Sequence, residues 1–267
     1  MNHNTLENIS NTISCDFIIL TALRPEFDAV CSVLSTHIKE RVFDTILGEV
    51  VTISLPAFDD DNRLINGIVV LIDGIGRVHS ALTTASVLRK YRTNCIMLVG
   101  IAGGFEANGV HIGDVIVSTE IIDYAINKII PSGLEFRPYR YAISPDLLRI
   151  AKKLSKMDKY LYTHDAKLIG RVHIGPIASG DQIFASSNAI KVLLKEEPLL
   201  LGVEMEGAGV AAAAFHENPP VRFIVVRGVA DLANELKSDK WIDVACLAAA
   251  KFAVDFLNHS SANYSGS

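Results

Sequence analysis

Short apolar runs rich in β-branched residues alternate along this chain with longer segments in which apolar residues recur at helical spacing. The runs have the length and composition of buried strands, and they are Asp16–Ala22, Gly67–Ile72, Cys95–Ile101, Val115–Thr119, Val172–Ala178 and Phe223–Val229. The segments between them predict helices over Pro25–Lys39, Val78–Tyr91, Pro145–Met157, Asn188–Glu196, Gly207–Phe215 and Lys240–Leu257. This alternation predicts an α/β fold around a largely parallel sheet.

The chain shows no sign of division into separate domains. Neither a Pro/Gly/Ser-rich linker nor an internal repeat interrupts its 267 residues, so we expect one domain over residues 15–259. Residues 1–14 are then an N-terminal extension, and the small polar residues 260–267 are a disordered tail. The least regular stretch, Ile121–Arg171, is also the most basic and predicts an insertion or a lid; its cations include Lys128, Arg137, Arg140, Arg149, Lys152 and Lys153.

Composition argues against several kinds of partner. A formal net charge of -5 without a block of Lys or Arg disfavours polymeric nucleic acid. The N-terminus has neither a basic head nor an apolar stretch, and no run approaches the ~20 apolar residues of a bilayer span, so we expect neither secretion nor membrane insertion. Four widely spaced cysteines without a CxxC pair are typical of free thiols in the cytoplasm. The sequence contains no P-loop, HExxH motif or Cys/His cluster, and we expect no metal and no cofactor.

The loops after the predicted strands are rich in glycine and acidic residues, and in α/β sheets ligands bind beyond the carboxyl ends of the strands. In the loop DGIGRVHS, Gly74 and Gly76 resemble the start of a dinucleotide-binding fingerprint, but His79 stands in place of the third glycine. Two other interpretations stay open for this loop. It is a tight turn, or its helix-start amides face a ligand oxygen with help from Arg77, His79 or Ser80.

Two glutamates interrupt the otherwise apolar segment Pro198–Phe215. Carboxylates are seldom buried without a partner or a task. Glu206 could complement the amide dipoles at the start of the helix that follows, and Glu204 could pair with Arg227 of the next strand. Because alternate residues of a strand share a face, both carboxylates could also point into one pocket.

Two further acids follow predicted strands. Asp231 comes directly after FIVVRGVA, and Glu26 follows the first strand, immediately after Pro25. Each has a structural alternative: Asp231 could be the N-cap of the next helix, and Glu26 a carboxylate in the first turn of its helix. The carboxyl ends of parallel strands meet at one edge of a sheet, so these acids and Glu206 together predict a functional site.

These motifs resemble the nucleoside phosphorylase superfamily, and within it the branch of 5′-methylthioadenosine/S-adenosylhomocysteine nucleosidases. The matching strings follow the family's order from residue 16 to residue 258: ILTALRPEFDAV, DGIGRVHSA, VGIAGGF with HIGDVIVS, IASGDQIF, GVEMEGAGVA and VVRGVADLAN. The resemblance implies a single-domain, three-layer α/β/α fold around a central mixed, largely parallel twisted sheet. It also implies an N-glycosidase that releases adenine from 5′-methylthioadenosine, S-adenosylhomocysteine or a related nucleoside, and a homo-oligomer, either a dimer or a hexamer.

The resemblance also assigns roles to residues. Asp231 looks like the acid that protonates purine N7, Glu206 like the carboxylate that holds the ribose hydroxyls, and Glu26 like the base that activates water. Burial would help such an acid to keep its proton near neutral pH. The remaining substrate-binding residues that the resemblance implies are Ala102, Gly103, Asp181, Ile183, Phe184, Glu204, Met205 and Arg227.

Other substrates and roles stay open at this point. Phosphorylases of the superfamily carry an arginine where this chain has Leu98, which favours water as the nucleophile, although the nearby Arg24 keeps phosphorolysis possible. Ala230 and Asn234 replace the Ser and Asp that nucleosidases usually have beside the catalytic acid. The basic stretch after Tyr124 is compatible with an adenine nucleotide, AMP or ATP, as substrate. A non-catalytic nucleotide-binding module is the alternative of a different class.

Overall fold

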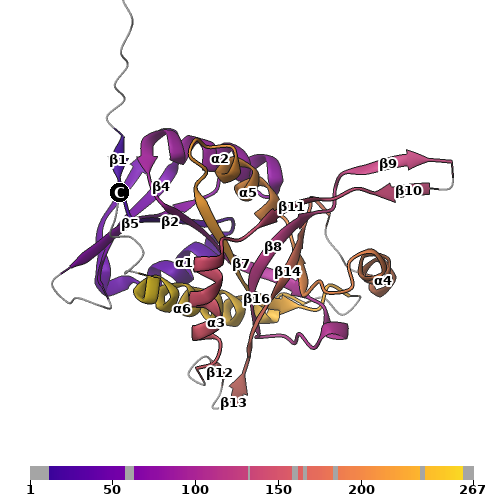
Figure 1. Ribbon diagram of the computed structural model, residues 1–267. Helices are drawn as coiled ribbons and strands as arrows, with labels where there is room; N and C mark the ends of the chain where they lie inside the picture. The colour runs from indigo at the N-terminus through magenta and orange to yellow at the C-terminus, as the bar shows by residue number, and fades with distance from the viewer. Residues whose placement is uncertain are drawn as a thin grey trace, which may run out of the picture.

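The computed structural model describes residues 12–57, 63–131, 133–157, 162–164, 167–182, 186–234 and 238–260. All six predicted strands and all six predicted helices are present in it (Figure 1). The principal strands are β2 (Phe17–Thr21), β3 (Ile38–Asp44), β4 (Gly48–Pro56), β5 (Leu64–Leu71), β7 (Cys95–Gly104), β8 (Val115–Asp123), β11 (Tyr139–Ala142), β14 (Val172–Ser179), β15 (Gly202–Glu204) and β16 (Arg222–Asp231). The helices are α1 (Arg24–Val33), α2 (Arg77–Lys90), α3 (Pro145–Leu154), α4 (Ser187–Glu196), α5 (Gly207–Phe215) and α6 (Ile242–Ser260).

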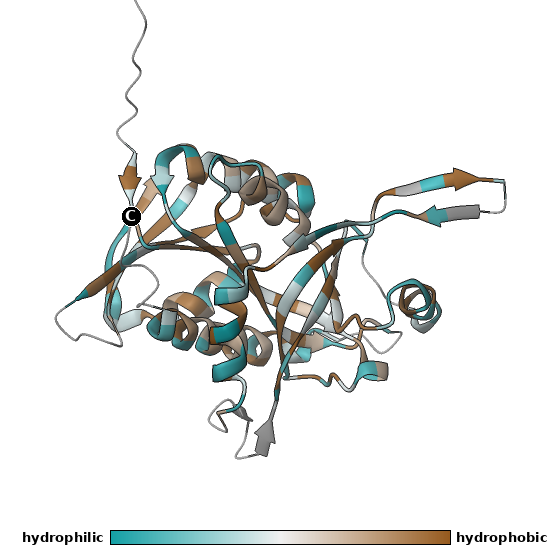
Figure 2. Cartoon of the chain, viewed as in Figure 1, coloured by the Kyte–Doolittle hydropathy of each residue, from teal (hydrophilic) through white to brown (hydrophobic). Residues whose placement is uncertain are grey.

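The centre of the sheet is parallel and covered on both faces. Strands β5, β2, β7 and β16 pair in parallel in that order, and nearly all of their residues are buried. Helices α2 and α5 pack together on one face, while α1 and α6 pack together on the other (Figure 1). Strands buried on both faces need continuous apolar runs, which are the brown strands at the centre of Figure 2. The expected three-layer α/β/α fold with a mixed sheet is confirmed.

Antiparallel strands flank this parallel centre. The helix predicted over Pro25–Lys39 ends at Val33, and the chain from Ile38 to Asp44 forms the edge strand β3, which pairs antiparallel with β4. That part of the helix prediction is therefore wrong. Local helical spacing was overridden by pairing with a strand that lies further along the chain.

The sheet is closed on one side rather than open. Strand β16 pairs in parallel with β7 and antiparallel with β8, and β8 returns to β7 through β14 and β15. Five strands therefore form a small barrel. Because β15 runs antiparallel to β7, the residues that follow β15 meet the carboxyl half of β7, and this crossing holds the site.

The basic stretch Ile121–Arg171 is more regular than expected. It contains the end of β8, the hairpin of β9 (Asn127–Ile130) and β10 (Gly133–Phe136), then β11, α3 and the hairpin of β12 (Tyr162–His164) and β13 (Lys167–Ile169). The β9–β10 hairpin projects from the body of the molecule in Figure 1. Three cations of the basic stretch could have bound the phosphates of a nucleotide, but each is paired with an acid. Lys128 and Arg137 face Glu135, and Arg140 faces Glu120 and Glu197.

Few of the residues expected in terminal extensions are described. Ile13 and Ser14 form β1, which pairs in parallel with β6 (Tyr91–Arg92), so these two residues of the expected extension join a two-stranded sheet. At the other end α6 continues to Ser260, three residues beyond the Leu257 predicted as its last residue. Within the described ranges, no helix is long and apolar enough to span a membrane.

Candidate active site

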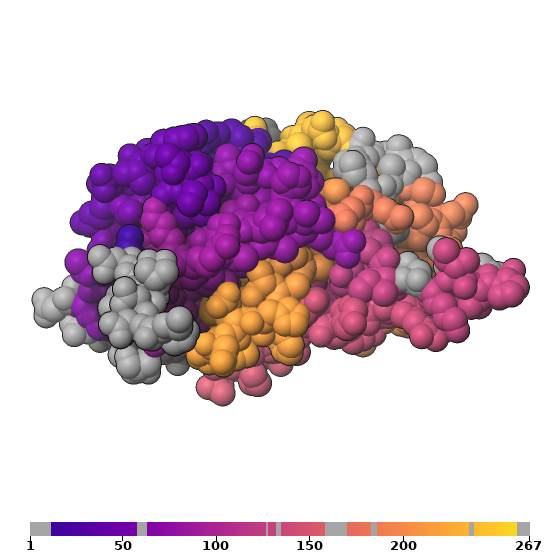
Figure 3. Space-filling view, turned by 90° about the horizontal axis from the view of Figure 1, so that it is seen from above, coloured from indigo at the N-terminus to yellow at the C-terminus, as the bar shows by residue number. Residues whose placement is uncertain are grey.

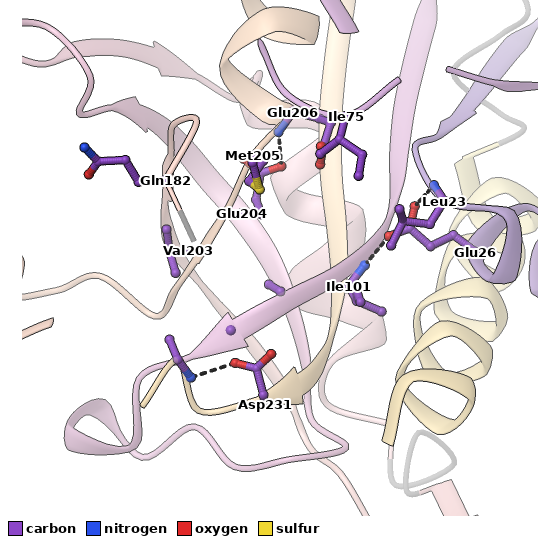
Figure 4. A pocket seen from close by; sticks show the side chains of 13 residues that line it. Leu23, Glu26, Ile75, Ile101, Gln182, Val203, Glu204, Met205, Glu206 and Asp231 are labelled. Atoms are coloured by element: carbon purple, nitrogen blue, oxygen red, sulfur yellow. Dashed lines mark hydrogen bonds between the residues drawn. The ribbon is translucent and has the colours of Figure 1, made fainter. Parts of the chain in front are cut away.

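A cavity of about 170 Å³ lies where β7, β15 and β16 meet. Figure 4 shows Asp231 on one side of it, with Glu26 and Glu206 on the others. The residues that line it are Leu23, Glu26, Ile75, Ile101, Ala102, Gly103, Gln182, Val203, Glu204, Met205, Glu206, Asp231 and Ala233. The structure therefore brings together the three predicted catalytic acids and four predicted substrate-binding residues, Ala102, Gly103, Glu204 and Met205.

Behind the acids lies a fully buried arginine. Nη2 of Arg227 is ion-paired with Glu204 and lies 3.1 Å from Oε2 of Glu206, and its Nη1 lies 3.6 Å from Oε1 of Glu26. The pairing of Glu204 with Arg227 was one of the two interpretations of that acid. Arg227 is not one of the described residues that line the cavity; it contacts the acids that do. Its β-strand partner is Gly100, where a Cβ atom would collide with Arg227 and Glu26.

This cluster has three carboxylates for one guanidinium. Burial raises the pKa of Glu206 to about 7, with Glu204 adding to the rise and Arg227 opposing it. Burial also raises the pKa of Glu26, and Arg227 again opposes the rise. Burial disfavours the charge of Arg227 itself, but Glu204 and Glu206 outweigh this and hold its pKa above the usual range. Glu206 is consequently poised to change charge close to neutral pH.

Glu26 is held in place by backbone amides. Its Oε2 accepts hydrogen bonds from the N–H groups of Ala22 and Leu23 at 2.8 and 2.9 Å, and its Oε1 accepts one from Ile101 at 2.8 Å. The bonds from Ala22 and Leu23 satisfy amides at the start of α1, as expected for a first-turn carboxylate. The bond from Ile101 ties the same carboxylate to β7. Glu26 thus caps its helix and also faces the cavity.

Glu204, the last residue of β15, and Glu206, two residues further on, have different partners. Glu204 accepts hydrogen bonds from the N–H groups of Glu206 and Gly207, at 3.0 and 2.8 Å, so it satisfies the first amides of α5. Glu206 was the residue expected to complement this helix terminus, and that alternative is wrong. Its Oε1 instead accepts a hydrogen bond from Gly76 N–H at 3.0 Å, and its side chain faces the cavity.

Asp231 is the last residue of β16 and is 8% exposed. Its Oδ1 accepts a hydrogen bond from the N–H of Ala233 at 2.7 Å. Ala233 adopts φ of 53°, a left-handed conformation that is uncommon outside glycine and is found at functional turns. The next described helical turn begins only at Asp239, so the N-cap alternative for Asp231 is wrong. The carboxylate closes a tight turn and lines the cavity.

The backbone amides at the start of α2 donate hydrogen bonds to side chains of the protein. Gly76 N–H donates to Glu206, and Arg77 N–H donates to Oδ1 of Asp181 at 2.9 Å. The interpretation in which these two amides face a ligand oxygen is therefore wrong. Asp181, which was expected to border the purine, has its carboxylate on Arg77 and is not among the described lining residues. Its neighbour Gln182 lines the cavity instead, while the predicted Ile183 and Phe184 lie outside the described residues.

Several lining residues were not predicted. They are Leu23, Ile75, Ile101, Gln182, Val203 and Ala233. Each stands within three residues of a predicted site residue or a loop glycine, so closeness in the sequence is the signal that could have found them. Their side-chain or backbone exposure to the cavity depends on how the strands cross, which local sequence does not encode.

A three-layer α/β/α fold with buried carboxylates around one cavity defines an enzyme-like site for a neutral or cationic small molecule. The chain belongs to the phosphorylase superfamily, whose family model matches residues 16–258. It is 30% identical over 173 residues to a 5′-methylthioadenosine/S-adenosylhomocysteine nucleosidase of Maridesulfovibrio salexigens, covering 64% of this chain and 71% of that protein. It is 29% identical over 174 residues to the nucleosidase of the same name from Desulfotalea psychrophila, covering 62% of this chain and 67% of that protein.

A solved structure has the same architecture. The S-adenosylhomocysteine nucleosidase of Streptococcus pyogenes, in complex with 5-methylthiotubericidin, superposes with a TM-score of 0.72 at 25% identity. The match covers 92% of this chain and 97% of that one. The similarity therefore extends over the whole domain that holds the cavity.

Proposed function

We propose that this protein hydrolyses the N-glycosidic bond of an adenine nucleoside such as 5′-methylthioadenosine or S-adenosylhomocysteine and releases adenine. The observation that carries the proposal is the convergence of Glu26, Glu206 and Asp231, from three separate elements, on one cavity. The names of the relatives, all methylthioadenosine or S-adenosylhomocysteine nucleosidases, support the adenine nucleoside as substrate.

Each acid has a chemical role in this reaction. The C1′–N9 bond breaks toward a cationic, oxocarbenium-like ribose, and the purine leaves readily only when N7 takes a proton, which Asp231 supplies. Glu206 accepts hydrogen bonds from the ribose hydroxyls, and its negative charge stabilises the developing cation. Glu26 removes a proton from the water whose oxygen bonds to C1′. The products are neutral adenine and the free sugar.

The charge of the cavity favours water over phosphate as the nucleophile. Its described lining includes four carboxylates and no Lys or Arg, and Arg227 is occupied by three of those carboxylates. A phosphate dianion there would meet like charge without a compensating cation. Arg24, the cation that kept phosphorolysis possible, is paired with Glu49 and Asp28. At the position of the phosphorylase arginine, Leu98 is fully buried.

The same observations weigh against an adenine nucleotide as substrate. The cations after Tyr124 that would bind its phosphates are already paired: Lys128 and Arg137 with Glu135, and Arg140 with Glu120 and Glu197. Retention of all three catalytic acids likewise favours an enzyme over a silent binding module. We therefore place the nucleoside first.

We also propose that the protein works as a homo-oligomer in the cytoplasm, with residues 15–259 as its domain. Ile75, Val78 and Leu82 are more than half exposed along one side of the α2 start, beside the cavity. Apolar side chains grouped in this way on a surface are typical of an interface between proteins. The four cysteines are free thiols, as is usual in a reducing compartment.

The function is tested by incubating the protein with methylthioadenosine, S-adenosylhomocysteine, adenosine, AMP and ATP, each with and without phosphate. Released base and sugar are measured by chromatography. We expect free adenine and free sugar from the nucleosides without phosphate. Strict dependence on phosphate, with a sugar 1-phosphate as product, would overturn hydrolysis, and faster release from AMP or ATP would overturn the nucleoside preference.

A further inference from the structure

Arg77, the first residue of α2, joins two loops that are far apart in the sequence. Its Nη1 lies 2.9 Å from both carboxylate oxygens of Asp123, at the end of β8. Its Nε donates to Oδ2 of Asp181 at 3.1 Å, while its backbone N–H donates to Oδ1 of the same residue at 2.9 Å. One arginine therefore fastens the start of α2 to the end of β8 and to the residues that follow β14.

These bonds are shielded in part from water. The side chain of Arg77 is 26% exposed and that of Asp123 is 10% exposed, whereas that of Asp181 is 45% exposed. Charged hydrogen bonds that are partly buried are worth more than pairs in open solvent. The planar guanidinium can serve the two carboxylates from different nitrogens, which the single ammonium group of lysine cannot do in the same geometry.

The residues on either side of this junction line the cavity. Ile75 precedes Gly76, whose N–H holds Glu206, and Gln182 follows Asp181. At Gly76 (φ 96°) a Cβ atom would lie 2.9 Å from Oδ1 of Asp181, so glycine permits the close approach of the two loops. The distance between two walls of the cavity thus depends on the Arg77–Asp181 contact.

A second set of contacts fixes the start of α2 against the ribose-side acid. Ser80 Oγ donates to the carbonyl oxygen of Glu206 at 2.9 Å. Glycine at position 209 lets the first turn of α5 approach Arg77 and Ser80 closely, and the two helices lie side by side in Figure 3 as purple and orange segments. Movement of the α2 start would therefore move Glu206 as well.

We propose that Arg77 is a positioning residue for substrate binding, which holds the Ile75–Gly76 turn and the Gly180–Gln182 loop at the separation that a nucleoside requires. The inference rests on the proposed function. Asp231 is positioned separately, by the turn at Ala233 on β16. Loss of Arg77 therefore loosens the substrate-binding walls and Glu206, while the acid that protonates the base stays in place, so KM should rise by a larger factor than kcat falls.

The first test compares steady-state kinetics of Arg77→Met, Arg77→Lys and Asp181→Asn with methylthioadenosine. We expect Arg77→Met to raise KM roughly 10- to 100-fold, as for loss of a charged hydrogen bond, and to lower kcat by a smaller factor. Arg77→Lys and Asp181→Asn should raise KM by smaller factors, because each keeps part of the junction. Unchanged KM in Arg77→Met, or in both other variants if that one does not fold, would overturn the proposal.

The matched control is Arg222→Met. Arg222 pairs with Asp146 at 2.6 Å, with side chains 28% and 29% exposed, and neither residue lines the cavity. We expect this variant to lose similar thermal stability without a rise in KM. A rise in KM equal to that of Arg77→Met would show that general destabilisation is responsible, and would overturn the positioning role.

A pH profile separates positioning from stability more directly. The Gly76 hydrogen bond lowers the pKa of Glu206, so loosening the α2 start in Arg77→Met should move the acidic limb of kcat/KM to higher pH. An unmoved limb would count against the proposal. If the wild type releases no adenine, the proposed function fails, but calorimetric Kd values for methylthioadenosine still test the role of Arg77. A Kd that rises in the Arg77 and Asp181 variants and not in Arg222→Met supports this role. A Kd equal to that of the wild type in the Arg77 and Asp181 variants overturns it.

Discussion

Nη2 of Arg227 lies 3.1 Å from Oε2 of Glu206 while it is also ion-paired with Glu204, and all three side chains are buried. With Glu26 also close to the guanidinium, one buried positive charge serves three acids. Glu204 is further occupied by the amides of α5, and Glu26 by those of α1 and β7. Glu206, whose carboxylate faces the cavity, has a pKa raised to about 7 by burial, so its charge changes close to neutral pH.

Replacement of Asp231 by asparagine should remove most turnover while the protein still folds. The amide oxygen can accept the hydrogen bond from Ala233 N–H, but the side chain can no longer protonate the purine. General-acid catalysis is typically worth roughly 10²–10⁴ in rate, and a loss of kcat of that order is expected. Single-turnover release of adenine and circular dichroism together provide the check; full activity would remove Asp231 from the mechanism.

Activity should rise with pH across the titration of Glu206. Its pKa is about 7, and only the ionised carboxylate can accept hydrogen bonds from two ribose hydroxyls and stabilise a cationic ribose. We expect kcat/KM for methylthioadenosine to increase between pH 6 and 8. In Glu206→Gln the rise should be absent and the activity low throughout, and persistence of the rise in that variant would assign it to another group.

Protein stability should respond to the same group with the opposite sign. The pKa of Glu206 in the folded protein, about 7, lies above the ordinary 4.5, so its contribution is fully present below pH 4.5 and is lost as the pH rises through 7. Glu206→Gln cannot ionise and should lose less stability than the wild type between pH 5 and 8, by up to about 3 kcal/mol. Urea denaturation at the two pH values measures the difference, and parallel losses would contradict it.

Replacement of Arg227, the cation that the three glutamates share, should lower the free energy of unfolding. Arg227→Met leaves Glu26, Glu204 and Glu206 buried without their counter-charge, and loss of one partner of a buried ion pair typically costs about 3–5 kcal/mol. We expect this loss in the free energy of unfolding at pH 8, and a smaller one at pH 5, where Glu206 is protonated in the wild type as well. A variant as stable as the wild type at pH 8 would show that the acids do not need the arginine.

Replacement of Gly100 by alanine should displace the two side chains that lie against it, Arg227 and Glu26. A Cβ there would overlap Arg227 and Glu26, and overpacking typically costs about 1–3 kcal/mol. We expect lower stability and a lower kcat, because Glu26 must shift. The matched control is Gly109→Ala, where φ is 77° but nothing lies within 4 Å of the new atom. It should be destabilised by strain alone and keep its kcat, and equal kcat values in both variants would contradict the expectation.

Periodicity in the sequence predicted the six helices and six of the strands, because local spacing of apolar residues reports burial on one face or on both; β3, β4, β11 and β15 were not predicted. The acids of VEMEG and the end of β16 likewise stood out by interrupting apolar runs. Local patterns could not determine that the helix predicted to Lys39 ends at Val33 and that Ile38–Asp44 forms an edge strand, since its partner β4 supplies the hydrogen bonds. That difference arises from pairing between segments.

The partner of each site residue was likewise determined by tertiary structure. Sequence alone identified Glu204, Glu206, Arg227 and Asp181 as site candidates. Closure of the sheet placed β15 antiparallel to β7, and this crossing assigned Glu204 to the α5 amides and Glu206 to the cavity. It also left Arg227 behind the acids, while Asp181 has its carboxylate bonded to Arg77 and is not among the described lining residues. The sequence determines which chemical group a residue carries. Long-range packing determines its partners, because burial and hydrogen bonding act between neighbours in space.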